Sequence, residues 1–466
     1  MFSTRLPASA VALLGLLLAL ASVVLHRGHR GMEISLSRLW NERGTAKASE
    51  GSAVGPTAVV GDADGRRVQQ LGRSQRRELF GRGGGGGGDS ERRRARLAFF
   101  IMSSGDDAAK LELLLPEIYD RDNVYLVHVD AKAPQDQTDQ IRKLVEANFP
   151  ARDGRPPNGR MLEPAGIVSW GGFSITLACL YGIAAALLWD DGWDYFINLS
   201  TSDFPVMTQD EMGLFLGEHA DSGVSFMDGS LMKGFEMRWQ GYTEDQGMQR
   251  RAGDHTAVAM TRLGWIERPY PQRFRLYKGE FWGVFHRSFC EYTTWSPDNV
   301  ARTLSAYFTG YRVSDESYFQ TLACHAEGKE FPIHGDNFRF ASWNEHHKDS
   351  QGRKIGANGE ILIHPQPLLM ASADKIKASG ALFARKFDYA KSHEVYVAIQ
   401  DDLRDSERSG ARLQRARGRF LAGASHKEGR EGFCGGRGEG SRRRRGLLEE
   451  GGRQDGDDSA PPPPVT

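Results

Sequence analysis

The pattern that most limits the fold of this chain is an alternation of short apolar runs with amphipathic stretches, which begins near residue 96. Residues 97–102, 124–129 and 195–199 have the length and composition of buried strands. Between the first two runs, four apolar residues recur at the spacing of one helical face: Leu111, Leu114, Leu115 and Ile118. This order predicts an α/β domain with a mostly parallel sheet and helices on both of its faces.

The ends of the predicted strands are the first place to look for a site, because ligands of parallel sheets bind beyond the carboxyl ends of the strands. These ends are residues 103–105, 130–132 and 200–205. Asp130 closes the second strand, where a carboxylate can accept hydrogen bonds from ribose hydroxyls or a base edge. Taken alone, a turn or helix-cap role is the simpler interpretation of Asp130.

Two segments in the second half of the chain carry charged residues that suit catalysis or phosphate binding. Residues 313–322 predict a helix with Ser314 as its N-cap and with Asp315 and Glu316 in its first turn. Compensation of the helix dipole would explain these acids equally well. Residues 383–387 place Arg385 and Lys386 between aromatic residues, and such a pair can bind a diphosphate and stabilise its departing charge. A basic pair is also common on ordinary surfaces.

The two ends of the chain differ in composition from its middle. Residues 7–25 are uncharged and long enough to span a bilayer, so we expect a transmembrane signal anchor after a short cytoplasmic end at 1–6. A cleaved signal peptide is the alternative. The 55 glycines crowd the regions on either side of the apolar middle, which predicts a flexible stem at 26–95 and a disordered tail at 401–466. The globular domain is then 96–400.

Charge and sequence motifs exclude several classes of function. The chain has 60 lysines and arginines against 60 aspartates and glutamates, and this balance gives no electrostatic case for a nucleic-acid partner. The arginine run at 442–445 is expected to be a solvated tail. The sequence contains no Walker A loop, no dinucleotide-binding glycine motif after a strand and no nucleophile elbow. Four cysteines allow one disulfide, but their spacing does not say which.

Seven segments, taken in order, resemble the core-2/I-branching β-1,6-N-acetylglucosaminyltransferase family, which also includes peptide O-xylosyltransferases and plant glucuronosyltransferases. The segments are HVDAK (128–132), SWGG (169–172), YFINLSTSDFPV (195–206), KGEFWGVFHRSFCEY (278–292), SDESYFQTL (314–322), FRFASWN (338–344) and FARKFD (383–388). Each one is weak by itself, whereas the ordered set is specific and covers nearly all of the globular part.

The resemblance implies a GT-A-type fold, a UDP-sugar donor and an inverting transfer to a hydroxyl of a glycan or protein acceptor. At matching positions it implies that Glu316 is the catalytic base, that Arg385 and Lys386 bind the diphosphate, and that Asp130 binds the uridine. Three further residues become candidate walls of the sugar sites: Trp170, Asp203 and Trp343.

No cofactor and no metal are expected, because two D-x-D triplets, at 62–64 and 455–457, lie in the predicted flexible ends and the basic pair can replace a cation. The family's usual layout implies a single-pass type II Golgi membrane protein with its catalytic domain in the lumen.

Residues 228–275 and 345–359 match the family poorly, and acceptor recognition is expected there. The sequence therefore leaves the sugar open, with N-acetylglucosamine or xylose favoured over glucuronic acid. It also leaves open a second class of function, a non-catalytic lumenal carbohydrate-binding or scaffold protein that retains the fold.

Overall fold

The computed structural model describes residues 93–232, 238–249, 260–326, 331–343, 347–348, 354–356, 359, 361–362, 364–406, 410–425 and 434. The predicted anchor at 7–25, nearly all of the predicted stem, the D-x-D triplets at 62–64 and 455–457 and the arginine run at 442–445 lie outside these residues. A third D-x-D triplet, Asp120-Arg121-Asp122, lies within them. No helix in the described part of the chain is long and apolar enough to cross a membrane.

A seven-stranded sheet in the order β12-β6-β11-β4-β1-β2-β3 forms the centre of the fold. Its strands are β1 (Leu97–Ser103), β2 (Val124–Val129), β3 (Gly159–Met161), β4 (Tyr195–Ser200), β6 (Ser225–Phe226), β11 (Val284–His286) and β12 (Ile333–His334). β1 pairs in parallel with β2 and β4, and β2 pairs in parallel with β3. β11 runs antiparallel to both β4 and β6. The expectation of a mostly parallel sheet is thus confirmed, with β11 inserted in the opposite direction.

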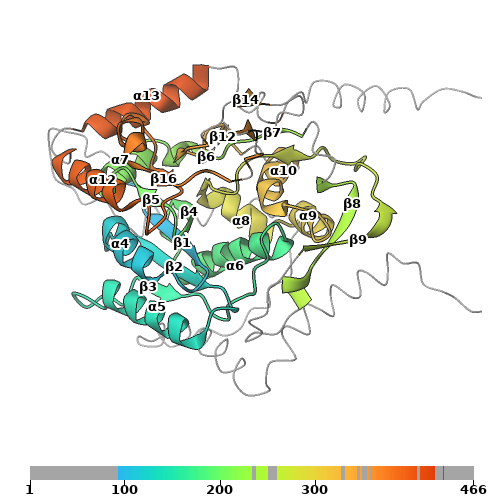
Figure 1. Cartoon of the computed structure of the whole chain (residues 1–466), viewed down its shortest axis with the longest axis horizontal. Helices are drawn as coiled ribbons and strands as arrows, with labels where there is room; N and C mark the ends of the chain where they lie inside the picture. The colour runs from blue at the N-terminus through green and yellow to red at the C-terminus, as the bar shows by residue number, and fades with distance from the viewer. Residues whose placement is uncertain are drawn as a thin grey trace, which may run out of the picture. The chain divides into compact units, whose positions relative to one another are not determined.

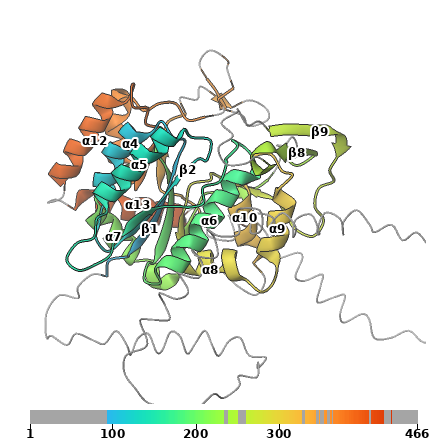
Figure 2. The same ribbon diagram turned by 90° about the horizontal axis from the view of Figure 1, so that it is seen from below.

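Helices cover both faces of this sheet, as the sequence predicts (Figure 1, Figure 2). One layer contains α4 (Ala108–Ile118), α5 (Gln135–Asn148), α7 (Gln209–Gly217), α11 (Ala373–Ala378) and α12 (His393–Ser406). The other contains α6 (Phe173–Trp189), α8 (Arg287–Trp295), α9 (Val300–Phe308) and α10 (Tyr318–His325). Alternate residues of β1 enter opposite cores, Phe99 on the α4 side and Phe100 on the α6 side. Burial on both faces explains why these strands are mostly apolar and do not alternate with polar residues.

Local signals in the sequence explain how several of these helices begin. The four residues of the predicted stripe on α4 are all buried. Thr208 caps α7, since its hydroxyl accepts a hydrogen bond from the amide of Glu211 at 3.3 Å. The helix expected from Ser314 onward starts later: Ser314–Glu316 form a 3-10 turn, and α10 begins at Tyr318. Asp315 and Glu316 thus lie just before the helix rather than in its first turn.

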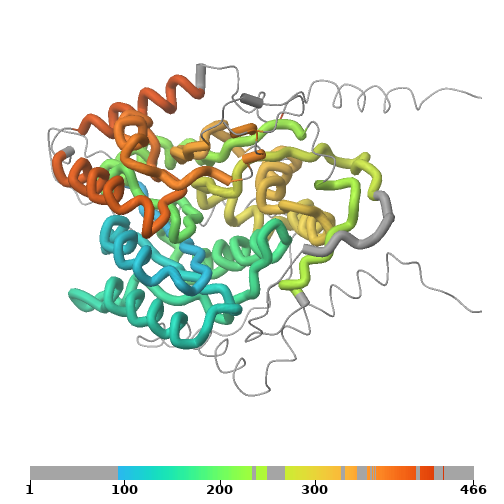
Figure 3. Tube along the Cα trace, viewed as in Figure 1, coloured from blue at the N-terminus to red at the C-terminus, as the bar shows by residue number. Residues whose placement is uncertain are grey.

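Four smaller sheets lie beside the central one. β13 (Arg339–Ala341), β16 (Phe383–Arg385) and β5 (Phe204–Pro205) form a three-stranded sheet that joins distant parts of the chain, with β16 in the middle. The colours of the tube in Figure 3 run along the chain and show that its late, orange part lies beside its early, green part. The remaining strands pair in twos: β7 (Ser230–Leu231) with β10 (Tyr277–Lys278), β8 (Gly241–Asp245) with β9 (Met260–Glu267), and β14 (His347–Lys348) with β15 (Lys354–Ile355). The three-stranded sheet is important for the site, because β16 ends in Arg385.

The predicted boundary at residue 400 is wrong, because ordered structure continues into the expected tail. α12 runs on to Ser406, and α13 (Ala411–Ser425) packs against α7 and β12. Arginines of α13 form ion pairs with acids elsewhere in the domain: Arg412 with Asp402, Arg417 with Glu218, and Arg419 with Asp336. Further on, Cys434 forms a disulfide with Cys324 at the end of α10. Part of the segment predicted to be a disordered tail therefore makes specific contacts with the domain.

Candidate active site

Asp203 lies at the carboxyl edge of the central sheet, just beyond the end of β4, and its side chain is completely buried. One oxygen, Oδ2, accepts hydrogen bonds from the Ser200 amide at 2.8 Å and from the Ser200 hydroxyl at 2.6 Å. The other oxygen, Oδ1, faces two guanidinium groups: Arg339 Nε at 3.7 Å and Arg385 Nε at 3.6 Å. Asp203 is therefore surrounded by protein, and its neighbours are cations.

Arg385 and Lys386 follow directly from β16 and bring positive charge to this edge. The Arg385 guanidinium lies over the ring of Trp282, 4.2 Å from its centroid. Burial lowers the pKa of the neighbouring Lys386, and the charges of Arg385 and Lys110 lower it further. Lys110 belongs to the first turn of α4. Two adjacent cations and a third from α4, which also pairs with Asp107 at 2.7 Å, thus bring positive charge to this edge, and positive charge suits a phosphate ligand.

Glu316 is held in the 3-10 turn before α10, with its side chain 40% exposed. Its Oε2 accepts a hydrogen bond from Arg238 Nη2 at 2.6 Å. Its main-chain carbonyl accepts one from the amide of Gly279 at 2.9 Å. The carboxylate is both fixed in place and accessible, two conditions for a general base that acts on a bound hydroxyl.

A short segment, residues 279–282, contacts both Glu316 and the basic pair. The Gly279 amide donates to the Glu316 carbonyl at 2.9 Å, and the Arg385 guanidinium lies 4.2 Å from the centroid of the Trp282 ring. Burial lowers the pKa of His364, the charges of Lys386 and Arg385 lower it further, and the charge of Glu316 opposes them. The His364 ring meets the edge of Trp170 at a centroid distance of 5.4 Å, and Trp170 is 58% exposed. The catalytic and binding roles of these residues stay predictions.

Asp130 and Trp343 have other neighbours. Asp130 Oδ1 accepts a hydrogen bond from the Lys132 amide at 3.0 Å, Oδ2 pairs with the Lys132 ammonium, and that ammonium also donates to the Val168 carbonyl at 2.6 Å. Asp130 does lie at the carboxyl end of β2, but in this state it stabilises its own turn. Lys354 lies over the ring of Trp343, 3.4 Å from the centroid. Among the described residues, no contact joins Trp343 to Glu316 or Arg385.

Sequence reasoning missed an acidic group beside Glu316. Asp228 accepts a hydrogen bond from the Glu280 amide at 2.8 Å, and Glu280 accepts one from the Asn337 side chain at 2.9 Å. Burial raises the pKa of Asp228 to about 7, and the charges of Glu280 and Glu316 add to the effect. Asp228 and Arg238 lie in the stretch that matches the family poorly, so no motif indicates them. Glu280 and Arg339 do lie inside segments that match the family, but only their charge indicates a function there.

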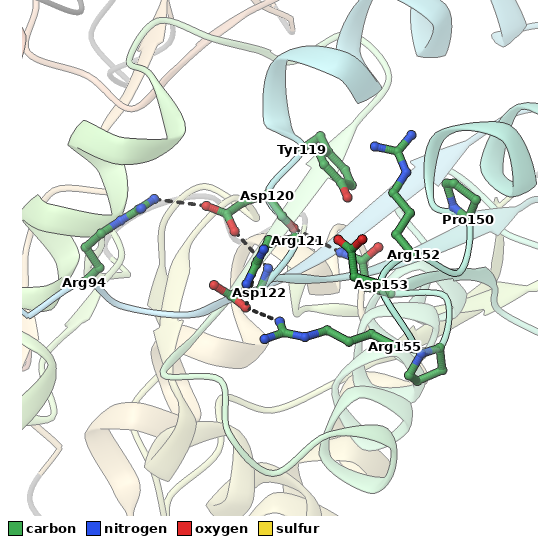
Figure 4. A pocket seen from close by; sticks show the side chains of 11 residues that line it. Arg94, Tyr119, Asp120, Arg121, Asp122, Pro150, Arg152, Asp153 and Arg155 are labelled. Atoms are coloured by element: carbon green, nitrogen blue, oxygen red, sulfur yellow. Dashed lines mark hydrogen bonds and ion pairs between the residues drawn. The ribbon is translucent and has the colours of Figure 1, made fainter. Parts of the chain in front are cut away.

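A cavity of about 560 Å³ opens at the opposite, amino edge of the sheet (Figure 4). Two of its arginines are already paired with acids: Arg94 with Asp120 at 3.0 Å, and Arg155 with Asp122 at 2.7 Å. The substrates of parallel α/β sheets bind at the carboxyl edge, so this cavity is not the candidate active site.

Comparisons with known proteins identify relatives of this chain among glycosyltransferases. β-Glucuronosyltransferase GlcAT14A of Arabidopsis thaliana is 29% identical over 306 residues, which cover 64% of this chain and 62% of that protein. Xylosyltransferase 1 of Homo sapiens is 26% identical over 302 residues, which cover 62% of this chain and 28% of that protein. The solved structure of mouse xyloside xylosyltransferase 1 covers 52% of this chain at 10% identity, and its TM-score of 0.25 is too low to support an argument.

The chain thus spans less than two thirds of the length of these two curated relatives. The sequence profile of the Core-2/I-Branching enzyme family matches residues 97–363, more than half of the chain. The matched region includes the central sheet and Glu316, and the chain therefore belongs to the Core-2/I-Branching enzyme family.

Proposed function

We propose that this protein is an inverting glycosyltransferase that moves a sugar from a UDP-sugar to a hydroxyl of a glycan or protein acceptor. The observation that carries the proposal is the segment 279–282, whose Gly279 amide donates to the Glu316 carbonyl and whose Trp282 ring lies under the Arg385 guanidinium. An accessible carboxylate and a cationic pair that contact the same short segment would supply a base for the acceptor and a binding site for the diphosphate. Family membership supports the same assignment.

The proposed reaction is one direct displacement. Glu316 takes the proton of the acceptor hydroxyl while the acceptor oxygen forms a bond to the anomeric carbon of the sugar. The bond from that carbon to the diphosphate oxygen breaks, and the electron pair leaves with UDP. Arg385 and Lys386 stabilise the charge on the departing diphosphate. Attack from the face opposite the leaving group inverts the anomeric centre. Arg238 orients the carboxylate through its hydrogen bond of 2.6 Å.

We also propose that the transfer needs no metal, because the basic pair can neutralise the diphosphate as a bound cation would. For the sugar, N-acetylglucosamine and xylose follow from the family resemblance. The two relatives described above are named a glucuronosyltransferase and a xylosyltransferase, which supports including glucuronic acid among the donors to be tested.

For the location, we propose a Golgi protein anchored by residues 7–25 with its domain in the lumen. The Cys324–Cys434 disulfide supports this location, because disulfides persist in the secretory pathway and are rare in the cytosol.

The test measures UDP release by the full-length chain from UDP-N-acetylglucosamine, UDP-xylose and UDP-glucuronic acid, with and without EDTA. We expect one preferred donor and no effect of EDTA. Activity that disappears in EDTA would contradict only the metal-free part. The absence of both UDP binding and hydrolysis in a folded sample would contradict the whole proposal.

Glu316→Gln separates an enzyme from a carbohydrate-binding protein that retains the fold. We expect turnover to fall by at least about 100-fold while UDP binding persists, because the amide cannot take the proton. The matched control is Glu291→Gln, since Glu291 also pairs with an arginine, Arg287, at 3.0 Å but lies on α8. The control should retain wild-type turnover. Equal rates for Glu316→Gln and the wild type would refute the role of Glu316.

A further inference from the structure

Asp203 differs from the other predicted sugar-site residues because its side chain has no exposed surface. Its Oδ2 is fixed by the two hydrogen bonds from Ser200. The main chain around it is fixed as well, since the Ser202 carbonyl accepts a hydrogen bond from the Phe387 amide at 2.8 Å. A carboxylate that is held this firmly and enclosed by protein is suited to position its neighbours.

The first neighbour, Arg339, is a cation inside the core, with a side chain only 1% exposed. Burial lowers the pKa of Arg339 to about 10, and Asp203 is the first of the charges that oppose this shift. Arg339 Nη2 donates to the Asn198 carbonyl at 3.1 Å, and the guanidinium lies over Phe383 at 4.7 Å. An unpaired buried charge is costly, so Asp203 is the counterion that allows Arg339 to occupy this place.

The second neighbour, Arg385, shares the same carboxylate oxygen. Within the described residues, Asp203 Oδ1, Arg339 Nε and Arg385 Nε are buried without a hydrogen-bond partner. One negative charge therefore faces two guanidinium groups at 3.6–3.7 Å and leaves a net positive charge. Arg385 is held between Asp203 and the Trp282 ring. These two contacts fix the orientation of the Arg385 side chain before the donor binds, and such preorganisation increases the affinity for the donor.

We propose that Asp203 is a positioning residue that, together with the buried Arg339, aligns Arg385 with the diphosphate of the donor. This inference rests on the proposed function, in which Arg385 binds the diphosphate. It replaces the expectation that Asp203 is a wall of the sugar site. Asp203 then acts on the phosphates only through Arg385, and contributes nothing to binding of the uridine.

The test compares the affinities of the full-length chain for UDP and for uridine by titration calorimetry. Asp203→Asn retains the shape of the side chain but removes its charge. We expect it to weaken UDP binding by about tenfold, or about 1.4 kcal/mol, and uridine binding by less than about twofold. The matched control is Asp190→Asn, because Asp190 also pairs with an arginine, Arg96, at 3.0 Å but follows the end of α6. The control should bind UDP as the wild type does.

A double-mutant cycle with Arg385→Ala tests whether the two residues act as one unit. We expect Asp203→Asn to have no further effect on UDP affinity once Arg385 is removed. Additive losses, or an equal loss of uridine binding, would overturn the inference. If Asp203→Asn does not fold, the double variant Asp203→Asn/Arg339→Gln removes both buried charges together and should show the same selective loss of UDP affinity.

The inference can fail separately from the proposed function. If the wild type binds UDP and Arg385→Ala weakens that binding while Asp203→Asn does not, the inference alone is wrong. If the wild type binds no UDP, both are wrong.

Discussion

The Cys324–Cys434 disulfide should be a major contributor to the stability of this domain. It joins residues 110 positions apart in the sequence. In the chain-entropy model, opening a loop of this length costs about 4.8 kcal/mol at 25 °C, and removal of native disulfides costs about 2–5 kcal/mol. Cys324 and Cys434 are both buried, and the Tyr277 hydroxyl donates a hydrogen bond to the Cys434 carbonyl. We therefore expect Cys434→Ser to lower the free energy of unfolding by about 4 kcal/mol.

Urea unfolding, followed by tryptophan fluorescence and circular dichroism, measures this loss. Cys324→Ser should cost nearly the same as Cys434→Ser, and the double variant should cost little more, because all three remove one bond. Dithiothreitol should destabilise the wild type and leave the double variant unchanged, which serves as the control for Cys179 and Cys290, the buried free thiols. Single variants within about 0.5 kcal/mol of the wild type, less than typical disulfide values, would refute the reasoning.

Two further predictions concern the buried His128 and the Gly279 backbone, which donates a hydrogen bond to Glu316. Burial lowers the pKa of His128 to about 4, below its unfolded value of 6.5, so stability should fall by about 2 kcal/mol between pH 7 and pH 5 as only the unfolded state gains the proton. Urea unfolding should show a smaller fall in His128→Gln, and equal falls would contradict the assignment. Gly279→Ala would place a Cβ 2.1 Å from the Asp228 carbonyl oxygen, so turnover should drop at least about tenfold with UDP affinity retained. Gly418→Ala in α13 is the control, because its Cβ meets nothing within 4 Å. This variant should retain turnover and gain about 0.5–1 kcal/mol in the free energy of unfolding. Equal turnover in both glycine variants would contradict the expected clash at residue 279.

The central layers were predictable from the sequence because each rests on a short-range pattern. The runs that became β1, β2 and β4 are mostly apolar on both faces, since the two cores take alternate residues. The reversed direction of β11 has no such pattern, because strand direction depends on how the chain returns to the sheet. The helical part of the predicted tail was missed for a related reason. Arg417 pairs with Glu218, 199 positions earlier, and nothing local distinguishes such an arginine from a solvated one.

The candidate site also contains residues that the sequence predicts and residues that it does not. Glu316, Arg385 and Lys386 lie in segments whose order resembles a family, so their positions could be carried over. Asp228 and Arg238 come from a stretch without that resemblance, and their importance depends on contacts with Glu280 and Glu316. The role of a buried charged residue depends on the group that it contacts. Here Glu280 contacts Asp228 from 52 positions away in the sequence, and Glu316 contacts Arg238 from 78 positions away.

The basic pair shows how structure decides between two interpretations that the sequence leaves open. An ordinary surface pair would have both cations in water and no fixed geometry, and its ion pairs would contribute little. Here β16 pairs with β5 and β13 and carries Arg385 to a buried carboxylate and an aromatic ring, while Lys386 is half-buried beside it. Burial lowers the pKa of Lys386, so its charge contributes little to the stability of the empty site. A bound anion would favour that charge, and in the proposed reaction the anion is the donor diphosphate.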